Sequence, residues 1–164
     1  ALSQARSMLF VCYGNINRSA LADVMVSAYA KGAGIAVASA GFHDVAGRPA
    51  DPVMVDVAKE FGLDMSGIRS TCVTHRMLRE NDIIFVMEKN HYDRLVAIDA
   101  GVADKVYLLG AHQRSTACPL EIEDPHGRSR ESYVACYRRI ADAMESIKAV
   151  IAVNSGGQGG DQFS

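Results

Sequence analysis

Short apolar runs alternate with segments of helical periodicity along this chain, and that alternation constrains the fold more than any other feature. The apolar runs, read as strands, are residues 8–12, 35–41, 83–87 and 105–110. The segments with helical spacing are residues 21–29, 51–62, 88–98 and a long one from about Arg130 to Ile151. Strands that alternate with helices form a parallel sheet covered on both faces. The sequence therefore predicts an α/β single-domain three-layer sandwich with a four-stranded parallel sheet flanked by helices.

The expected domain occupies residues 8–153, between an N-terminal extension (1–7) without predicted structure and a Gly-rich flexible tail (154–164). A chain of 164 residues is long enough to bury one core without staples. The net charge of −2, with no basic block, argues against binding to nucleic acid or to an anionic membrane. No apolar run approaches the roughly 20 residues that cross a bilayer, and no leader segment is evident. We therefore expect a cytoplasmic protein.

The cysteines are widely spaced at positions 12, 72, 118 and 136, with no C-x-x-C pair and no His neighbour at zinc spacing. In a chain without a secretion signal this pattern indicates reduced thiols rather than disulfides. It also predicts no metal site. Three of the four thiols are expected to be packing or surface groups, and Cys12 stands apart because of its surroundings.

Cys12 ends the first apolar run, and the stretch "VCYGNINRSA" places Arg18 six positions later, where a helix begins. A C-x5-R spacing alone is weak, and an inert buried thiol is the plain alternative. Ligands of parallel sheets, however, bind beyond the carboxyl ends of the strands. A loop of this composition can direct its N–H groups at an oxyanion, and the helix N-terminus favours both the anion and a thiolate.

The residue types of this loop fit phosphate chemistry. Arg18 offers a planar fork for two phosphate oxygens, and Ser19 can donate its hydroxyl to the sulfur of Cys12. The predicted phosphate-binding loop after the first strand contains Tyr13, Gly14, Asn15, Ile16, Asn17 and Ser19 besides the cysteine and the arginine.

Attack on a phosphate ester also needs a proton for the leaving oxygen. Asp124 in "EIEDPHG" is a candidate donor, because Pro125 stiffens its loop before the last helix. An Asp-Pro pair that only starts a turn, or an acid that caps the helix, is the structural alternative.

These motifs together resemble the low-molecular-weight protein tyrosine phosphatase family. The resemblance rests on "VCYGNINRSA", "SAG", "ADP", "IIFVMEKNH" and "EDPHG" in one order over residues 8–150. It implies that Cys12 is the nucleophile, that Arg18 binds phosphate and that Asp124 is the general acid. It further implies that Asn15 and Ser39 brace the loop, and that the substrate cleft is walled by His43, Asp44 and His126.

Four positions depart from the family pattern. Asn17 stands where a second loop cysteine is common, so no protective disulfide can form within the loop and Cys12 is expected to oxidise more readily. Ala20 replaces a proline at the helix start. His126, followed by Gly127, replaces an aromatic residue of the cleft wall. Ile68 stands where a histidine commonly braces the loop.

Two further residues have alternative interpretations. Glu88 could orient Arg18 from the end of the third strand, or could be a favourable charge in the first turn of a helix, and we favour the second slightly. Tyr13 could be a wall for an aromatic ester or could simply pack over the loop.

The sequence thus predicts a monomeric phosphatase that hydrolyses phosphotyrosine in proteins through a phosphocysteine intermediate, binding phosphate or vanadate without a cofactor. An arsenate reductase on the same scaffold would need resolving thiols close to Cys12. The presence of Cys12, Arg18 and Asp124 argues against a catalytically inactive module that only binds phosphate or docks a partner. A phosphoarginine phosphatase is a third alternative, because pocket size decides between these substrates.

Overall fold

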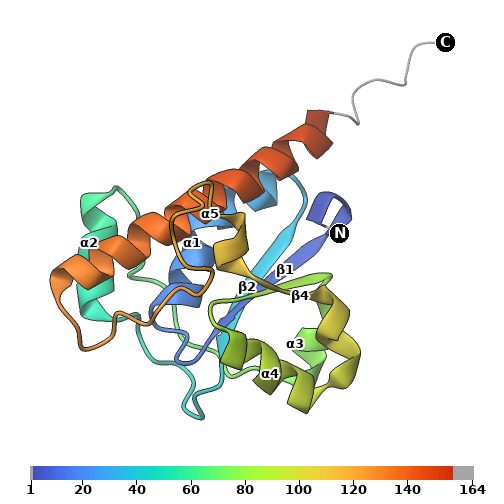
Figure 1. The fold of residues 1–164 in the computed structure, drawn as a ribbon, viewed down its shortest axis with the longest axis horizontal. Coiled ribbons are helices and arrows are strands. Elements are labelled where there is room, and N and C mark those ends of the chain that lie inside the picture. The colour runs from blue at the N-terminus through green and yellow to red at the C-terminus, as the bar shows by residue number, and fades with distance from the viewer. Residues whose placement is uncertain (1, 157–164) are drawn as a thin grey trace.

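The computed structural model describes residues 2–156, with side chains to Val153, and its centre is a four-stranded parallel sheet (Figure 1). The spatial order of the strands is β2-β1-β3-β4. Their bounds are β1 Ser7–Cys12, β2 Ala36–Gly41, β3 Ile83–Val86 and β4 Val106–Leu108. The predicted four-stranded parallel sheet is confirmed.

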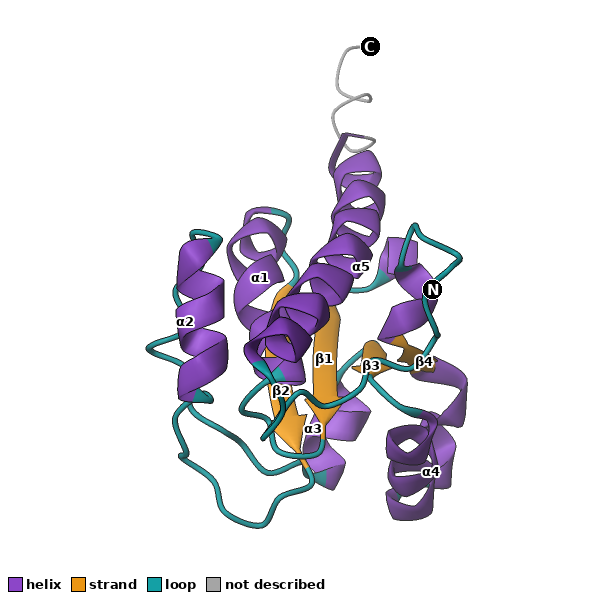
Figure 2. Cartoon of the chain, turned by 60° about the vertical axis from the view of Figure 1, so that its left-hand side comes forward, coloured by secondary structure: helices purple, strands orange, loops and turns teal. Residues whose placement is uncertain are grey.

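Helices cover both faces of this sheet. The α-helices are α1 Arg18–Gly32, α2 Pro52–Glu60, α3 His75–Glu80, α4 Lys89–Ile98 and α5 Arg130–Gly156. Short 3-10 helices are η1 Leu2–Gln4, η2 Ala100–Lys105 and η3 Leu109–His112. Figure 2 shows α1, α2 and α5 on one side of the sheet, with α3 and α4 on the other.

The side chains of β1 alternate between the two cores. Met8 and Phe10 pack among residues of α1, α2 and α5, whereas Leu9 and Val11 pack with residues of α3 and α4. Successive side chains of a strand point to opposite faces, so a strand buried on both faces is apolar throughout. This is why the run "MLFVC" shows no polar alternation.

The carboxyl ends of the central strands place the loop that follows β1. Cys12 pairs in register with Gly41, the last residue of β2. A Cβ added to Gly41 would lie 2.7 Å from the carbonyl oxygen of Tyr13 and 2.9 Å from the backbone nitrogen of Asn15. Glycine at this position therefore lets the loop after β1 rest directly on the end of β2.

The ends of the chain and the last strand differ in detail from the expected bounds. Leu2 packs against the core from η1, and Ser7 already belongs to β1, so residues 2–7 are structured. The fourth strand is shorter than the predicted 105–110 because the chain turns into η3, where Gly110 lies directly against the backbone of Leu120. Helix α5 extends to Gly156, and the rest of the predicted tail lies outside the described residues.

Candidate active site

The loop between β1 and α1, residues 12–18 and here called the phosphate loop, presents backbone N–H groups at the carboxyl end of the sheet. Within the described part of the chain, the N–H groups of Gly14, Ile16 and Asn17 have no protein acceptor. The N–H of Asn15 lies 3.3 Å from Sγ of Cys12. Asn15 has a left-handed φ of 54°, which Asn tolerates better than most residues. Such a ring of N–H groups binds anions.

The side chain of Asn15 braces the phosphate loop, as the resemblance implies. Its Nδ2 donates to Oγ of Ser19 at 2.8 Å, and its Oδ1 accepts from the N–H of Thr71 at 2.8 Å. The Ser19 oxygen accepts from Asn15, and its hydroxyl proton can point at Sγ of Cys12, 2.9 Å away, or at the more distant carbonyl oxygen of Ala40, 3.4 Å away. A donor at this distance stabilises a thiolate. Ile68, where a bracing histidine is common, packs against the core instead.

Arg18 is 1% exposed, and groups distant in the sequence orient its guanidinium. Its Nη1 donates to Oε2 of Glu88 at 2.6 Å and to the carbonyl oxygen of Ile122 at 2.8 Å. Its Nε is buried and has no partner among the described residues, so it is available to an oxyanion. Burial works to lower the pKa of Arg18, but the surrounding negative charges, that of Cys12 first, outweigh it and raise that pKa.

Glu88 both begins α4 and orients Arg18, so the two interpretations do not exclude each other. Glu88 does sit at the N-cap of α4, but its carboxylate turns toward the guanidinium and remains 23% exposed. The backbone N–H of Glu88 donates to Nδ1 of His91 at 3.2 Å. Glu88 thus forms a capping box with His91 at the start of α4 while its carboxylate holds Arg18.

His91 is 2% exposed, and sequence analysis overlooked it. Burial first, and then the positive charges of Arg18 and Arg94, lower the pKa of His91 to about 4. The ring is therefore neutral near pH 7, with Nδ1 as acceptor and the proton on Nε2, 3.5 Å from Oε2 of Glu88. His91 thus supports the carboxylate that orients Arg18.

We expect His91 to make the fold sensitive to mild acid. Its pKa is about 4 in the folded protein and about 6.5 when unfolded, so its contribution is complete above pH 6.5 and lost as the pH falls toward 4. Between pH 7.5 and pH 5 the free energy of unfolding should fall by about 2 kcal/mol through this group. Urea unfolding at both pH values measures the loss. His91→Asn keeps an acceptor and does not titrate, so an equal loss in that variant would contradict the prediction.

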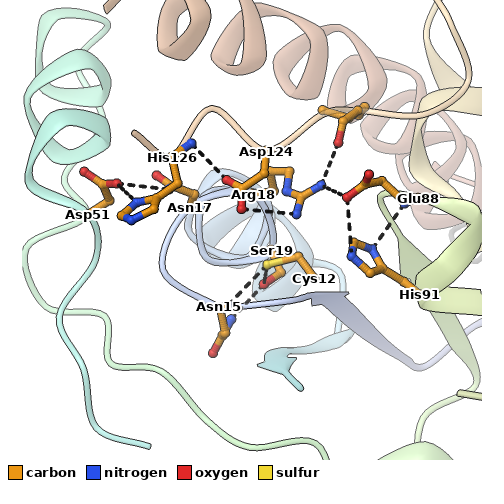
Figure 3. Close-up of polar contacts among 12 residues, drawn as sticks. Cys12, Asn15, Asn17, Arg18, Ser19, Asp51, Glu88, His91, Asp124 and His126 are labelled. Atoms are coloured by element: carbon orange, nitrogen blue, oxygen red, sulfur yellow. Dashed lines mark hydrogen bonds and ion pairs between the residues drawn. The ribbon is translucent and has the colours of Figure 1, made fainter. Parts of the chain in front are cut away.

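Asp124 belongs to the segment 122–128 before α5, here called the acid loop. The loop is fixed to the end of β3 because the N–H of Ile122 donates to the carbonyl oxygen of Met87 at 2.9 Å. Oδ2 of Asp124 lies 3.6 Å from Nη2 of Arg18, and the side chain is 41% exposed. Figure 3 shows Asp124 beside the Arg18 guanidinium, with Cys12 below it. The structure therefore brings the three predicted chemical residues together.

A cavity of about 200 Å³ opens over the phosphate loop. Its lining residues are Cys12, Tyr13, Gly14, Ile16, Asn17, Arg18, His43, Arg48, Asp124 and His126. Tyr13 is 47% exposed at the rim, and its ring meets that of His43 edge-on at 6.1 Å. Two of the three residues expected in the cleft wall, His43 and His126, thus line this cavity, and so does Tyr13.

Asp44 and Ser39 lie elsewhere than expected. The side chain of Asp44 is 94% exposed and borders a neighbouring cavity beside Cys72 and Arg94, so the expected wall role is wrong. The hydroxyl of Ser39 donates to Oδ2 of Asp23 on α1 at 2.8 Å rather than to the phosphate loop. The Ser39 side chain points from β2 toward α1. Gly41 is the residue of this strand that contacts the phosphate loop.

Two other residues of the site had no clear signal in the sequence. Arg48 lines the cavity and donates from Nη2 to the carbonyl oxygen of Gly14 at 2.7 Å. Asp51 accepts from Nδ2 of Asn17 at 3.1 Å. Its position before Pro52 predicts a helix N-cap, and Asp51 does accept from the N–H of Val53, but this signal does not reveal the second contact.

Residues 2–156 contain no group of three or more His, Cys, Asp or Glu side chains that could hold a metal ion. In the same part of the chain, no helix is long and apolar enough to cross a membrane.

The fold is a parallel β-sheet covered by helices, with an anion-binding loop after its first strand. The loop lies beside a thiol, an arginine fork and a carboxyl group. Together these features define a phosphate-ester hydrolase. Residues 7–156 match the family described as low molecular weight phosphotyrosine protein phosphatase, and the chain belongs to this family. The chain is 35% identical over 131 residues to the low molecular weight protein-tyrosine-phosphatase Wzb of Escherichia coli K12, covering 80% of this chain and 85% of that protein.

Solved structures agree with this assignment. The crystal structure of the Erwinia amylovora tyrosine phosphatase AmsI superposes with a TM-score of 0.79 at 33% identity, covering 88% of this chain and 91% of AmsI. Vibrio vulnificus Wzb in complex with benzylphosphonate gives 0.78 at 30% identity, covering 88% and 97%. The protein is thus a protein-tyrosine-phosphatase, a hydrolase acting on phosphotyrosine.

Proposed function

We propose that the protein hydrolyses phosphotyrosine in proteins through a phosphocysteine intermediate. Sγ of Cys12 attacks phosphorus as the P–O bond to tyrosine breaks, and Asp124 gives its proton to the leaving oxygen. The Asp124 carboxylate then takes a proton from water, whose oxygen bonds to phosphorus and releases the Cys12 thiolate. After the second step the Cys12 thiolate and the protonated Asp124 are both regenerated, and no cofactor is needed.

One observation carries this proposal: the thiol, the guanidinium and the carboxyl group line a single cavity of about 200 Å³. The N–H groups of the phosphate loop and the fork of Arg18 face the position where three phosphoryl oxygens would lie. These groups are fixed before substrate arrives, by Asn15 and Glu88, and such preorganised donors are the main source of transition-state stabilisation. Benzylphosphonate, which the Vibrio relative binds, is an analogue of an aryl phosphate in which CH2 replaces the ester oxygen.

A comparison of substrates tests the proposal. Hydrolysis of p-nitrophenyl phosphate and of a phosphotyrosine peptide should be faster than that of matched phosphoserine and phosphoarginine peptides. Tyr13 and His43 at the rim favour an aromatic ester that reaches down to Cys12. Preferential hydrolysis of the phosphoarginine peptide would assign the protein to a different substrate, and arsenate-dependent thiol oxidation without hydrolysis would replace the reaction.

A further inference from the structure

One buried carboxylate connects the phosphate loop to the acid loop. Asp51 is 5% exposed, and its Oδ2 accepts three side-chain hydrogen bonds. The donors are Nδ2 of Asn17 at 3.1 Å, Nδ1 of His126 at 2.8 Å and the hydroxyl of Tyr133 at 2.7 Å. They belong to the phosphate loop, the acid loop and α5, respectively. Figure 3 shows Asp51 reached by both Asn17 and His126 at the edge of the site.

The contact with Asp51 indicates which ring nitrogen of His126 is the donor. Burial works to raise the pKa of Asp51, but the hydrogen bonds that it accepts, that of His126 first, outweigh burial and lower its pKa. An ionised carboxylate only accepts hydrogen bonds, so Nδ1 of His126 must carry a proton. The His126 ring is therefore fixed in orientation although its side chain is 64% exposed.

The backbone of His126 in turn fixes Asp124. The N–H of His126 donates to Oδ1 of Asp124 at 3.1 Å, which leaves Oδ2 on the side of Arg18. A turn closes behind it, because the N–H of Arg128 donates to the carbonyl oxygen of Pro125 at 2.9 Å and Gly127 has a φ of 74°. The carboxyl of Asp124 is thus tied to a residue whose side chain is anchored on Asp51.

The other end of the connection is equally fixed. The backbone N–H of Asp51 donates to the carbonyl oxygen of Ile16 at 2.9 Å, in addition to the bond from Asn17. Asp51 is therefore hydrogen-bonded to the phosphate loop at two points. Asn17 and His126, two positions where the chain departs from the family pattern, are both bound to this one carboxylate.

We propose that Asp51 is a positioning residue, which through His126 holds the carboxyl group of Asp124 over the phosphate loop. This inference rests on the proposed function, in which Asp124 is the proton donor. Proton transfer requires the donor within hydrogen-bond reach of the leaving oxygen, and a misplacement of about 1 Å can cost on the order of 100-fold in rate.

The test uses His126 variants and esters whose leaving groups differ in acidity. His126→Phe keeps a ring but no donor, so kcat on a tyrosine-like ester should fall by about 10- to 100-fold. An aryl ester with an acidic leaving group scarcely needs the proton and should lose far less. His126→Asn places an amide N–H near the position of Nδ1 and should restore most of the rate. Inhibition by inorganic phosphate should be unchanged in both variants.

Asp51→Asn addresses the carboxylate itself. The Asn Oδ1 can still accept from the N–H of Val53 at the start of α2, while an NH2 group replaces the Oδ2 that accepts from His126. The rate losses of Asp51→Asn should depend on the acidity of the leaving group in the same way as those of His126→Phe. If His126 acts through Asp51, the double variant with His126→Phe should be no slower than the slower single variant.

Arg128→Gln is the matched control, because it removes an exposed ion pair with Glu123 from the same loop and does not touch Asp51. Equal losses on all leaving groups, or additive effects in the double variant, would overturn the positioning role. Asp124→Asn separates the two proposals. If that variant lacks leaving-group dependence, the proposed function fails. If it has the dependence and His126→Phe does not, only the role of Asp51 and His126 fails.

Discussion

Cys12→Ser should lower turnover of phosphotyrosine by at least about 100-fold while phosphate still binds. A serine hydroxyl occupies nearly the same position but remains protonated where a thiol can ionise, so the attacking group is lost. The anion site should survive, because Arg18 and the N–H groups of Gly14, Ile16 and Asn17 make no hydrogen bond to the sulfur. Steady-state rates with a phosphotyrosine peptide, set beside calorimetric titration with phosphate, measure both effects.

Cys118→Ser provides the comparison for a general effect of losing a thiol. Cys118 lies in the segment after η3, and its sulfur is 4.0 Å from the hydroxyl of Ser115, away from the cavity. That variant should hydrolyse substrate at the wild-type rate. Activity of Cys12→Ser above about a hundredth of wild type would exclude Cys12 as the nucleophile.

Asp124→Asn should lower kcat on phosphotyrosine by about 10²- to 10⁴-fold, the usual contribution of general acid catalysis. The substitution suits the question, because the Asn Oδ1 can still accept from the N–H of His126 and preserve the turn. A residue that only shaped the turn or capped α5 would instead cost roughly 0.5–2 kcal/mol of stability with the chemistry intact. Rates and thermal unfolding measured together separate these roles.

The dependence of the rate loss on the leaving group shows whether Asp124 acts in the step in which the ester oxygen departs. A nitrophenolate leaves without a proton, so the variant should lose least on such esters and most on tyrosine-like ones. Glu123→Gln removes the neighbouring, 72% exposed carboxylate and should leave the rates unchanged. If Asp124→Asn loses the same factor on every ester, the proton comes from another group.

Periodicity predicts the layered fold because both cores impose it on the chain. Met8 and Leu9 face opposite cores, so the first strand must be apolar throughout, and Pro52 and Gly62 mark the ends of a helix by backbone geometry. Cys12 and Arg18 were also predictable, since both lie within one short loop whose spacing is visible in the sequence. Asp124 required the resemblance to a family, because nothing local relates it to a loop more than 100 positions earlier.

Periodicity and spacing could not decide the long-range contacts that support the site, although Glu88 was one candidate partner of Arg18. Glu88 contacts Arg18 across 70 positions, and Asp51 contacts His126 across 75. Contacts between residues so far apart in the sequence produce no periodic pattern. In addition, the position of each carboxylate at the start of a helix is already explained by helix capping. His91 was hidden for the opposite reason, because a lone histidine carries no pattern until its burial is known.

The bond from Arg18 to the carbonyl oxygen of Ile122 spans 104 positions, and this has a consequence for the time at which activity arises. Synthesis proceeds from the N-terminus, so Cys12 and Arg18 exist well before the segment that carries Asp124. Closing so long a loop is entropically unfavourable until β3 and α5 pack against the earlier elements. Under the proposed mechanism, a nascent chain would therefore hold the thiol before its proton donor, and catalysis toward tyrosine esters would begin only when the last part of the domain has folded.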